Sequence, residues 1–460
     1  MFREYLPLGN RAVPVSYPIV GQVPYWLLDR FGFLEACAAS RASIFELKLG
    51  RRAYLLNHHE DIKHVLATNY TNYSKNARLS DRTGQRLFGD GVQTQYGSQH
   101  QHQRRQVQPA FMRRAIAAFA PQIVATVEAK LSTWHSHTDI DIVPELIQLV
   151  HCVLGQVLFS LDFDRQDRAF GEAVMVRRRQ VNDQFSLKAP FVKLWRDGRH
   201  SLNSQVLQQL EAQVDQMIQA RRHEPYRYRD LLSTLVQLRS SSSSPMSDKQ
   251  LRDEALATTG GYETIAAAVI WTVYLLAQQP QIEDKLAHEI SQIVGNRLPT
   301  AEDIPALKYS KQILNEALRL YPPTWIFTRT ANQPDCLPSG TKLEPGTKLY
   351  LSPYVVHRNP AYFPKPERFE PERFSKAGKQ TRPEFVYFPF GGGPRVCIGQ
   401  TLAETFATLI LIAMVQRVRL TLVSDQTAGQ RLVKRPSITL LPDQSLKMRK
   451  QLKAQPELSQ

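Results

Sequence analysis

Cys397 is the cysteine in the most distinctive setting of this chain, within the stretch FGGGPRVCIG from Phe390 to Gly399. Glycine-rich backbone precedes it and an apolar helical run follows it, so the thiol is expected at the end of a loop. A thiolate presented in this way is a metal ligand or a nucleophile. A lone cysteine is ordinarily a buried structural residue, and the glycines around this one argue against that role.

The spacing around this cysteine fits a haem iron. Phe390, Gly393, Arg395, Cys397 and Gly399 stand where backbone N–H groups can surround a sulfur atom, while the glycines let a flat macrocycle approach the main chain. Any short motif carries a risk of accidental matching, and agreement at all of these positions makes that risk small.

A second unusual stretch is GGYET, from Gly260 to Thr264, inside an otherwise apolar helical run. Two adjacent glycines in a helix interior are each about 1 kcal/mol less favourable than alanine. Such a break indicates that the backbone opens there or that a ligand comes close, and the acid and alcohol Glu263 and Thr264 stand directly beside it. The alternative is a glycine crossing point between two packed helices.

These two segments resemble the haem-binding signature and the oxygen-binding kink of the cytochrome P-450 family, the haem-thiolate monooxygenases. Two further segments, ILNEALRLYPP and HRNPAYFPKPERFEPERF, are similar to the family's ExxR helix and its meander. The segment GSQHQHQRRQVQPAF is similar to the family's propionate-binding helix. The motifs follow the family's order from about residue 97 to 403, and chance does not explain that order.

The resemblance implies both a fold and a cofactor. The fold would be mainly α with a smaller β-rich region, and haem b, iron protoporphyrin IX, would lie between the long oxygen-binding helix and the helix after the cysteine loop. Thr264 and Glu263 would be catalytic and would deliver protons from water during oxygen activation. Cys397 would be the proximal iron ligand, and further haem contacts would come from Phe390, Gly391, Gly399 and Gly261.

The same resemblance implies that the remaining motif residues support the cysteine loop or neutralise the charge of the haem propionates. Glu316, Arg319 and Arg373 would form a buried triad that supports the cysteine loop, although an isolated i, i+3 ion pair is usually a surface salt bridge worth little. The two haem propionates require cations. Their contacts would be His100, Arg104, Arg329 and Arg395. Position 100 is often tryptophan in the family, so the protonation of His100 stays open.

The implied reaction inserts one oxygen atom from O2 into a lipophilic small molecule, with a terpenoid or fatty acid as the leading candidate. Substrate contacts by family position would be Leu87, Phe88, Ala257, Gly260, Trp325, Ile326, Phe327 and Ile438, and each could equally be ordinary core.

Two other functions stay open. One alternative is a peroxide-dependent haem-thiolate peroxygenase or isomerase, and another is a non-enzymatic haem sensor or electron-transfer protein. Glu263 and Thr264 favour oxygen activation, because peroxide chemistry has no need of their relay.

The composition limits the partners of this 460-residue chain. Its net charge of +16 is spread over doublets such as Arg221-Arg222 and the triplet Arg177-Arg178-Arg179, which we interpret as solvated faces. No nucleic-acid-binding signature accompanies them, so nucleic acid is not an expected partner. The charge instead suits an acidic electron donor, a ferredoxin or flavodoxin with its reductase, steered by residues such as Arg105 and Arg113.

The first 30 residues are interrupted by charges and prolines, so no membrane anchor is expected. The four cysteines lie far apart and form no CxxC pair, which suits a reducing cytoplasm. We therefore expect a cytoplasmic protein whose electron donor is a separate chain, because nothing after Leu420 is long enough to be a second catalytic module.

The elements that must position these residues are also readable. Strands are predicted at Ile44 to Leu49 and Arg52 to Leu56, and amphipathic spacing predicts a helix through Leu202 to Ile218. A capping box at Ser247 and Gln250 should begin a long helix that ends near Gln278, after a low-complexity break at Ser240 to Pro245. Further helices are predicted at Ser310 to Leu320 and Gln400 to Val415.

We expect the chain to form one domain, 1–460. Its β-rich lobe would comprise roughly residues 1–75, 325–390 and the C-terminal strands, and its α-rich lobe would comprise the remainder.

Overall fold

The computed structural model describes residues 21–39, 42–48, 52–75, 88–185, 199–240, 246–380, 382–423 and 433–453. The chain forms two compact units. The first unit comprises Met1–Ala77, Asn315–Cys397 and Lys434–Leu441, and the second comprises Arg78–Leu314, Ile398–Val433 and Pro442–Gln460. Sheet structure dominates the first unit and helices dominate the second.

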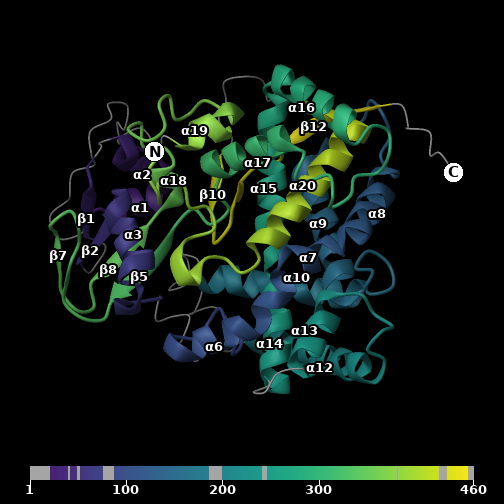
Figure 1. The fold of residues 1–460 in the computed structure, drawn as a ribbon, viewed down its shortest axis with the longest axis horizontal. Helices are drawn as coiled ribbons and strands as arrows, with labels where there is room; N and C mark the ends of the chain where they lie inside the picture. Colours follow the sequence, from purple (N-terminus) through teal and green to yellow (C-terminus); the bar gives the residue numbers. More distant parts are fainter. Residues whose placement is uncertain are drawn as a thin grey trace. The chain divides into compact units, whose positions relative to one another are not determined.

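The first unit is built on a five-stranded sheet with the strand order β1-β2-β8-β5-β3 (Figure 1). Its strands are β1 (Ile44–Lys48), β2 (Arg52–Leu56), β3 (Tyr73–Ser74), β5 (Phe327–Ala331) and β8 (Lys348–Leu351). β1 pairs antiparallel with β2, and β2 pairs parallel with β8. The two strands predicted early in the chain are therefore confirmed.

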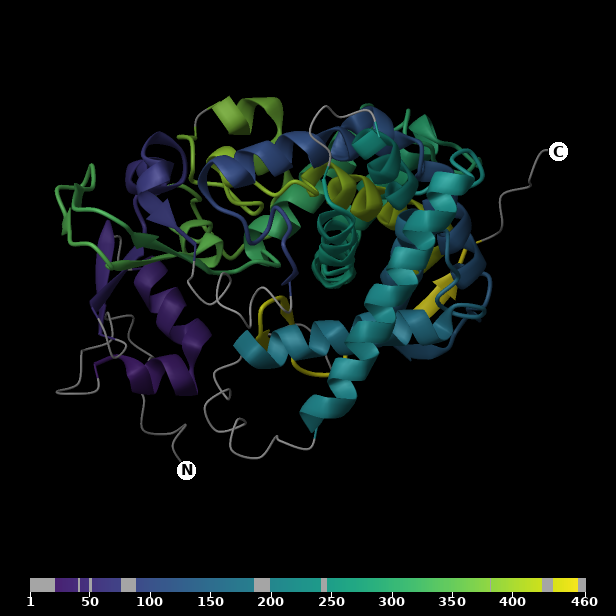
Figure 2. The ribbon, with the colours of Figure 1, turned by 90° about the horizontal axis from the view of Figure 1, so that it is seen from below.

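Each face of this sheet buries its own hydrophobic cluster, because side chains alternate along a strand. Ala53 and Leu55 of β2 pack with the helices α1 (Val23–Leu28) and α2 (Arg30–Ala39), which lie beside the strands in purple in Figure 2. Tyr54 and Leu56 face the other way and pack with α3 (His59–Lys63) and the π-helical turn η1 (His64–Thr68).

The remaining elements of the first unit are short and follow the proline-rich part of the sequence. They are η2 (Tyr70–Asn72), β6 (Asp335–Cys336), β7 (Lys342–Leu343), α18 (Pro353–Val356), η4 (Pro371–Phe374), α19 (Lys376–Gln380), η5 (Gly393–Arg395) and β10 (Lys434–Pro436). β11 (Leu440–Pro442) pairs with β10. Such short pieces, held by side chains, position the loop that carries Cys397.

A completely buried carboxylate organises the core of this unit. Glu316, on α17 (Lys308–Leu320), accepts two hydrogen bonds of 2.7 Å from Arg319, and the Arg373 Nε lies 3.4 Å from its Oε1. Both Glu316 and Arg319 are 0% exposed. Arg319 also donates to the carbonyl groups of His357, Pro366 and Arg368. Its guanidinium therefore joins α17 to the segment from His357 to Arg368.

The second unit surrounds the helix α15 (Gly261–Ala277), which is apolar on nearly every face and buried along its length from Ile265 to Leu276. It packs against α9 (Ile142–Phe159), α16 (Pro280–Ile293) and α20 (Gln400–Arg417). α8 (Ala120–Leu131) in turn packs on α9 and α20. The helices predicted near residues 310 and 400 are both present.

The other helices of the second unit lie around this centre. They are α6 (Gly97–Val107), η3 (Gln108–Phe111), α7 (Arg113–Ala117), α10 (Arg168–Phe185), α12 (Arg199–His223), α13 (Leu231–Ser240) and α14 (Asp248–Thr259). A three-stranded sheet of β4 (Asp139–Asp141), β12 (Lys447–Leu452) and β9 (Val418–Leu422), in that order, completes the unit. α12 confirms the predicted amphipathic helix, because Leu210, Val214 and Ile218 are fully buried along it. The low-complexity break at Ser240 to Pro245 falls largely outside the described residues.

Two segments are long and apolar enough to cross a membrane by length and composition, Ile142–Phe159 and Asp248–Ala277. Within the structure, 61% of the first window and 78% of the second are buried by the protein itself. Both segments are therefore core helices of the second unit in this structure.

The interpretation of the basic clusters as solvated faces is wrong for several arginines. Arg221 is 3% exposed and donates to both carboxylate oxygens of Asp230, while Arg177 is 9% exposed and donates to the Leu256 carbonyl. Burial lowers the pKa of Arg177 to about 10, against the opposing influence of Asp253 and Glu211. These cations are internal cross-links, which a charge count from sequence does not reveal.

We expect Arg319→Leu to destabilise the protein strongly, since it leaves the Glu316 carboxylate buried without its main partner. Breaking a buried pair in this way costs roughly 3–5 kcal/mol. Arg227→Ala is a matched control, because Arg227 and Glu224 form an i, i+3 pair of 2.6 Å whose side chains are 64% and 50% exposed, and such pairs contribute under about 1 kcal/mol. Urea unfolding followed by circular dichroism measures both. Equal losses in the two variants would contradict the buried-charge explanation.

Candidate active site

The cysteine loop places its thiol at the end of a tightly turned segment. Gly391 and Gly393 adopt positive φ values of 75° and 65°, which glycine accepts without strain. The Cys397 backbone N–H donates to the Phe390 carbonyl at 2.9 Å and so closes the loop. Gly399 is the N-cap residue of α20, which follows directly.

The thiol of Cys397 is exposed, unlike that of Cys37, the most deeply buried cysteine in the chain. Burial raises the pKa of Cys37 to about 12, and it raises the pKa of Cys152 to about 11. Those two thiols are therefore poor sources of thiolate. Cys397 combines an accessible sulfur with the glycine-rich backbone that the sequence predicted.

His357 connects the cysteine loop to the buried triad. Its Nε2 accepts the Phe388 backbone N–H at 3.0 Å, just before the loop begins, and its carbonyl accepts from Arg319 at 2.8 Å. Complete burial, with Arg319 and Arg358 nearby, lowers the pKa of His357, so the imidazole is neutral and can accept. Glu316, Arg319 and Arg373 thus lie together as the resemblance implied, and their influence reaches the loop through His357.

The predicted long helix is interrupted at Gly260, between α14 and α15. The capping box of Ser247 and Gln250 begins α14 as predicted, but regular helix stops at Thr259 and resumes at Gly261. The Thr264 hydroxyl donates to the Gly261 carbonyl at 2.9 Å, and Gly261 is the first residue after the interruption. The break that the paired glycines predicted is therefore present.

Glu263 is held by α10. Its carboxylate accepts from Arg178 Nε at 2.6 Å and from Asn182 Nδ2 at 3.0 Å, and its side chain is 10% exposed. Sequence reasoning missed both partners, since Arg178 was interpreted as part of a solvated triplet. The acid next to Thr264 is consequently a member of an ion pair between two helices of the second unit.

The four residues predicted to bind propionates are divided between the units, two on one helix of the second unit and two on separate elements of the first unit. His100 and Arg104 stand one turn apart on α6, His100 being buried and Arg104 half-buried. Arg329 on β5 is 8% exposed and donates to the Thr328 carbonyl at 2.9 Å. Arg395 lies in η5, within the cysteine loop, and is half-buried.

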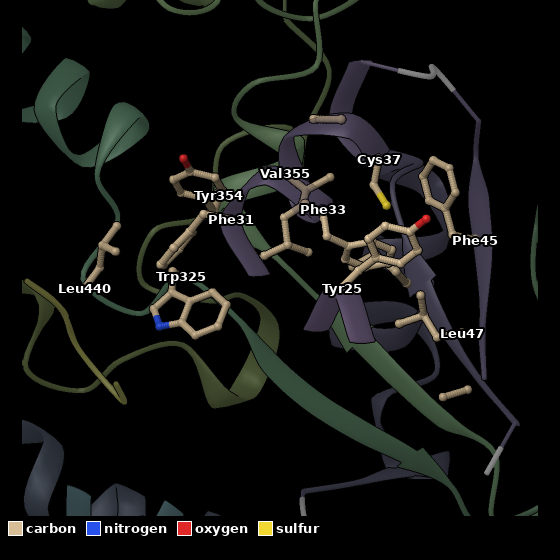
Figure 3. Packing of buried hydrophobic residues seen from close by; sticks show 14 residues of the cluster. Tyr25, Phe31, Phe33, Cys37, Phe45, Leu47, Trp325, Tyr354, Val355 and Leu440 are labelled. Carbon is tan, nitrogen blue, oxygen red and sulfur yellow. The ribbon is translucent and has the colours of Figure 1, made fainter. Parts of the chain in front are cut away.

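The predicted substrate contacts have different surroundings. Trp325 belongs to the hydrophobic cluster of the first unit, where its ring packs against Phe31 and its indole N–H donates to the Ser437 carbonyl (Figure 3). This placement favours the alternative of ordinary core for Trp325. Ile326, Phe327 and Ile438 are half-buried, Phe88 is buried, Ala257 and Gly260 are half-buried, and Leu87 lies outside the described residues.

The segment after Phe88 is clamped by two neighbouring acids of α14. Asp253 Oδ2 accepts the Asp90 backbone N–H at 2.8 Å, and Glu254 Oε1 accepts the Val92 backbone N–H at 2.6 Å. Gly89 has a φ of 72°, and a Cβ there would lie 2.5 Å from the Asp253 side chain. No pattern in the sequence predicts this clamp, because the partners of the two acids are backbone groups more than 160 residues away.

The residues of each unit fit a haem. Among the described residues, nothing lies within 4 Å of a Cβ built at Gly391 or at Gly261, so both positions leave open space beside the backbone. In the first unit, Gly391 belongs to the loop that carries the exposed Cys397 and the half-buried Arg395, and the same unit contains the buried Arg329. A flat, dianionic macrocycle with a thiolate-ligated iron matches this donor set.

The fold is that of a solved haem domain. A crystal structure of the cytochrome P-450DA haem domain superposes with a TM-score of 0.84 at 21% identity, covering 96% of this chain and 98% of that one. The family model of cytochrome P-450 matches residues 13–447, and the chain belongs to this family. The protein is accordingly a haem b oxidoreductase that uses O2, a lipophilic substrate and a redox partner, as monooxygenases of this family do.

Three relatives match along almost their whole length. Cyclooctatin synthase of Streptomyces melanosporofaciens is 33% identical and is covered to 93%, over 94% of this chain. Cyclooctat-9-en-7-ol 5-monooxygenase of the same organism is 31% identical, with 92% of each chain covered. Pentalenene oxygenase of Streptomyces avermitilis is 30% identical, over 90% of this chain and 91% of the relative.

The clamp on the Phe88 segment predicts a pH dependence of stability. Burial raises the pKa of Glu254 from 4.5 to about 7, although the Val92 N–H opposes the shift, and Asp253 adds to it. The folded chain therefore keeps a proton that the unfolded chain loses. The free energy of unfolding should fall as pH rises from about 4.5 to about 7, by up to about 3 kcal/mol, and this contribution should be flat above that range.

Glu254→Gln should remove this part of the pH dependence, since an amide oxygen still accepts from Val92 but does not ionise. Unfolding free energies at several pH values, compared between the variant and the wild type, measure the difference. Identical pH profiles for the two proteins would show that Glu254 is not the titrating group.

Proposed function

We propose that this protein hydroxylates a cyclic terpenoid. The observation that carries the proposal is the set of relatives covered over nine-tenths of both chains, which are named a cyclooctatin synthase, a cyclooctat-9-en-7-ol 5-monooxygenase and a pentalenene oxygenase. Apolar side chains at several candidate substrate positions, Phe88, Ile326, Phe327 and Ile438, support a lipophilic substrate of this kind. A fatty acid is the competing substrate class.

In this proposal Cys397 is the iron ligand. Its exposed sulfur, at the end of a loop closed by the Cys397 to Phe390 backbone bond, supports that role. Phe390, Gly391 and Gly399, with Gly261 of α15, would contact the macrocycle, and His100, Arg104, Arg329 and Arg395 would neutralise its propionates. When bound, the haem supplies the oxygen chemistry, and thiolate donation favours cleavage of the O–O bond.

Thr264 and Glu263 would supply protons. The Thr264 hydroxyl donates its only proton to the Gly261 carbonyl at the helix interruption, so its oxygen can accept a hydrogen bond from water, and it must release this carbonyl before it passes its own proton on. Glu263 would collect protons from water. Because Arg178 and Asn182 hold its carboxylate, the acid must exchange these partners for water when it transfers a proton.

The electron donor would be a separate acidic protein, a ferredoxin or a flavodoxin with its reductase, in the cytoplasm. Arg105 and Arg113 are both exposed on the second unit and would attract such a donor. The formal charge of +16 supports this direction of attraction. The family fixes the need for a redox partner, and the donor's type is the part proposed here.

The substrate proposal predicts that cyclic terpene hydrocarbons or alcohols convert the haem from low spin to high spin. Titration of the purified haem protein with cyclic diterpenes, cyclic sesquiterpenes and straight-chain fatty acids of similar carbon number measures the change in absorption. Phe88→Ala should weaken terpene binding about tenfold, which corresponds to about 1.4 kcal/mol, whereas Tyr226→Ala, at a residue 90% exposed, should not change it. A spin shift with fatty acids alone would refute the terpenoid proposal.

Thr264→Ala should keep the haem but divert reducing equivalents into hydrogen peroxide, with product formation per electron reduced at least about tenfold. Thr272→Ala is the matched control on the same helix, because the Thr272 hydroxyl likewise donates to a backbone carbonyl, that of Ala268 at 2.7 Å. Parallel measurement of donor oxidation, peroxide and hydroxylated product gives the coupling. Full coupling in Thr264→Ala would remove Thr264 from the proton path.

A further inference from the structure

The cysteine loop rests against the backbone of another segment of the first unit. A Cβ built at Gly393 would lie 1.9 Å from the Leu66 carbonyl oxygen and 3.1 Å from the Ala67 Cα. Gly393 also has a φ of 65°. A side chain at this position would therefore have to displace main chain, so the loop and the turn that carries Leu66 are in direct backbone contact.

That turn is η1, one turn of π-helix. The Asn69 backbone N–H donates to the His64 carbonyl at 2.8 Å and closes a wider ring than an α-helix would make. Turns of this type are rare and frequently lie at functional sites. Val65 and Leu66 are buried in the hydrophobic cluster on this face of the sheet, so the turn is packed against the core of the first unit.

Asp335 ties both ends of the turn to one oxygen atom. His64 Nε2, at the start of the turn, lies 2.9 Å from Asp335 Oδ2, and Asn69 Nδ2, at its end, donates to the same oxygen at 2.9 Å. The Tyr73 hydroxyl donates to this oxygen as well. The other carboxylate oxygen accepts the Cys336 backbone N–H at 2.8 Å.

The carboxylate is held in its charged form by these donors. Burial would raise the pKa of Asp335, but the hydrogen bonds from Tyr73, His64, the Cys336 N–H and Asn69 outweigh burial and lower the pKa to about 2. The Asp335 side chain is 12% exposed, so its bonds are shielded from water. Hydrogen bonds to a charged, shielded acceptor are among the stronger ones in proteins.

We propose that Asp335 is a positioning residue for Cys397. By holding the two ends of η1 together, it fixes the Leu66 carbonyl on which Gly393 rests and thereby fixes the loop that presents the thiol. The proposal rests on Cys397 being the iron ligand, and it adds a support to the one that Arg319 gives through His357.

The test compares Asp335→Asn with Glu35→Gln in the haem-loaded protein. Glu35 of α2 is a control carboxylate on the other side of the sheet, where it accepts from Tyr354, a member of the other hydrophobic cluster, at 2.5 Å and from Lys434 at 2.6 Å. Two quantities are measured under mild denaturant: the loss rate of the long-wavelength band of the reduced, carbon-monoxide-bound form, and hydrogen exchange in residues 64–69 and 390–397. Cys397→His defines the spectrum without thiolate.

Asp335→Asn should accelerate loss of the thiolate band about tenfold, the factor that corresponds to one charge-assisted hydrogen bond, and should raise exchange in both segments together. Glu35→Gln should leave both quantities near wild type even where it lowers overall stability. Unchanged values in Asp335→Asn, or equal changes in Glu35→Gln, would overturn the proposal.

Two further comparisons keep the result interpretable. If Asp335→Asn does not fold, Asn69→Ala keeps the carboxylate and frees one end of the turn, and it should raise exchange in residues 390–397; unchanged exchange there would overturn the proposal. If wild-type protein lacks the thiolate band, the ligand assignment of Cys397 fails, and joint exchange of the two segments still decides whether Asp335 holds the loop.

Discussion

The polar architecture of the first unit follows from the burial of one negative charge. The Glu316 carboxylate has no contact with water, so its charge must be matched by hydrogen bonds and cations within a few ångströms. Arg319 donates two hydrogen bonds to this carboxylate, and its remaining N–H groups donate to three backbone carbonyls. One of these carbonyls belongs to His357, whose ring accepts the Phe388 N–H. The course of the chain into the cysteine loop is thus specified by bonds that begin at a single charge.

The second unit uses arginine in a comparable way. Arg221 joins α12 to the start of α13 through Asp230, Arg177 joins α10 to α14, and Arg178 joins α10 to α15 through Glu263. In each bond a guanidinium N–H replaces water as the donor to a buried oxygen atom. Such a charge-assisted hydrogen bond, shielded from solvent, is stronger than one at the surface. Arg221 and Arg178 are each matched by a buried acid, so these pairs leave the formal net charge of +16 unchanged. The positive charge that could attract a donor lies on other residues, such as the exposed Arg105 and Arg113.

The sequence was informative wherever the physical reason was local. Propensity and capping predicted the strands β1 and β2 and the start of α14 at Ser247, and the energetic disadvantage of adjacent glycines predicted the interruption at Gly260. The family resemblance is confirmed by the match over residues 13–447. Contacts between distant segments were not predictable in this way. Asn182 beside Glu263 is one example, and Glu254 bound to a backbone N–H is another, because a main-chain partner leaves no mark on the sequence.

The contact between Gly393 and the Leu66 carbonyl joins two stretches of main chain without any side chain in between. The contact requires that residue 393 has no side chain, and it uses a backbone carbonyl that every amino acid at position 66 would provide. Engineering of the loop is therefore asymmetric. Position 66 accepts any apolar residue of suitable volume, whereas at position 393 even one methyl group requires the main chain of one of the two segments to move.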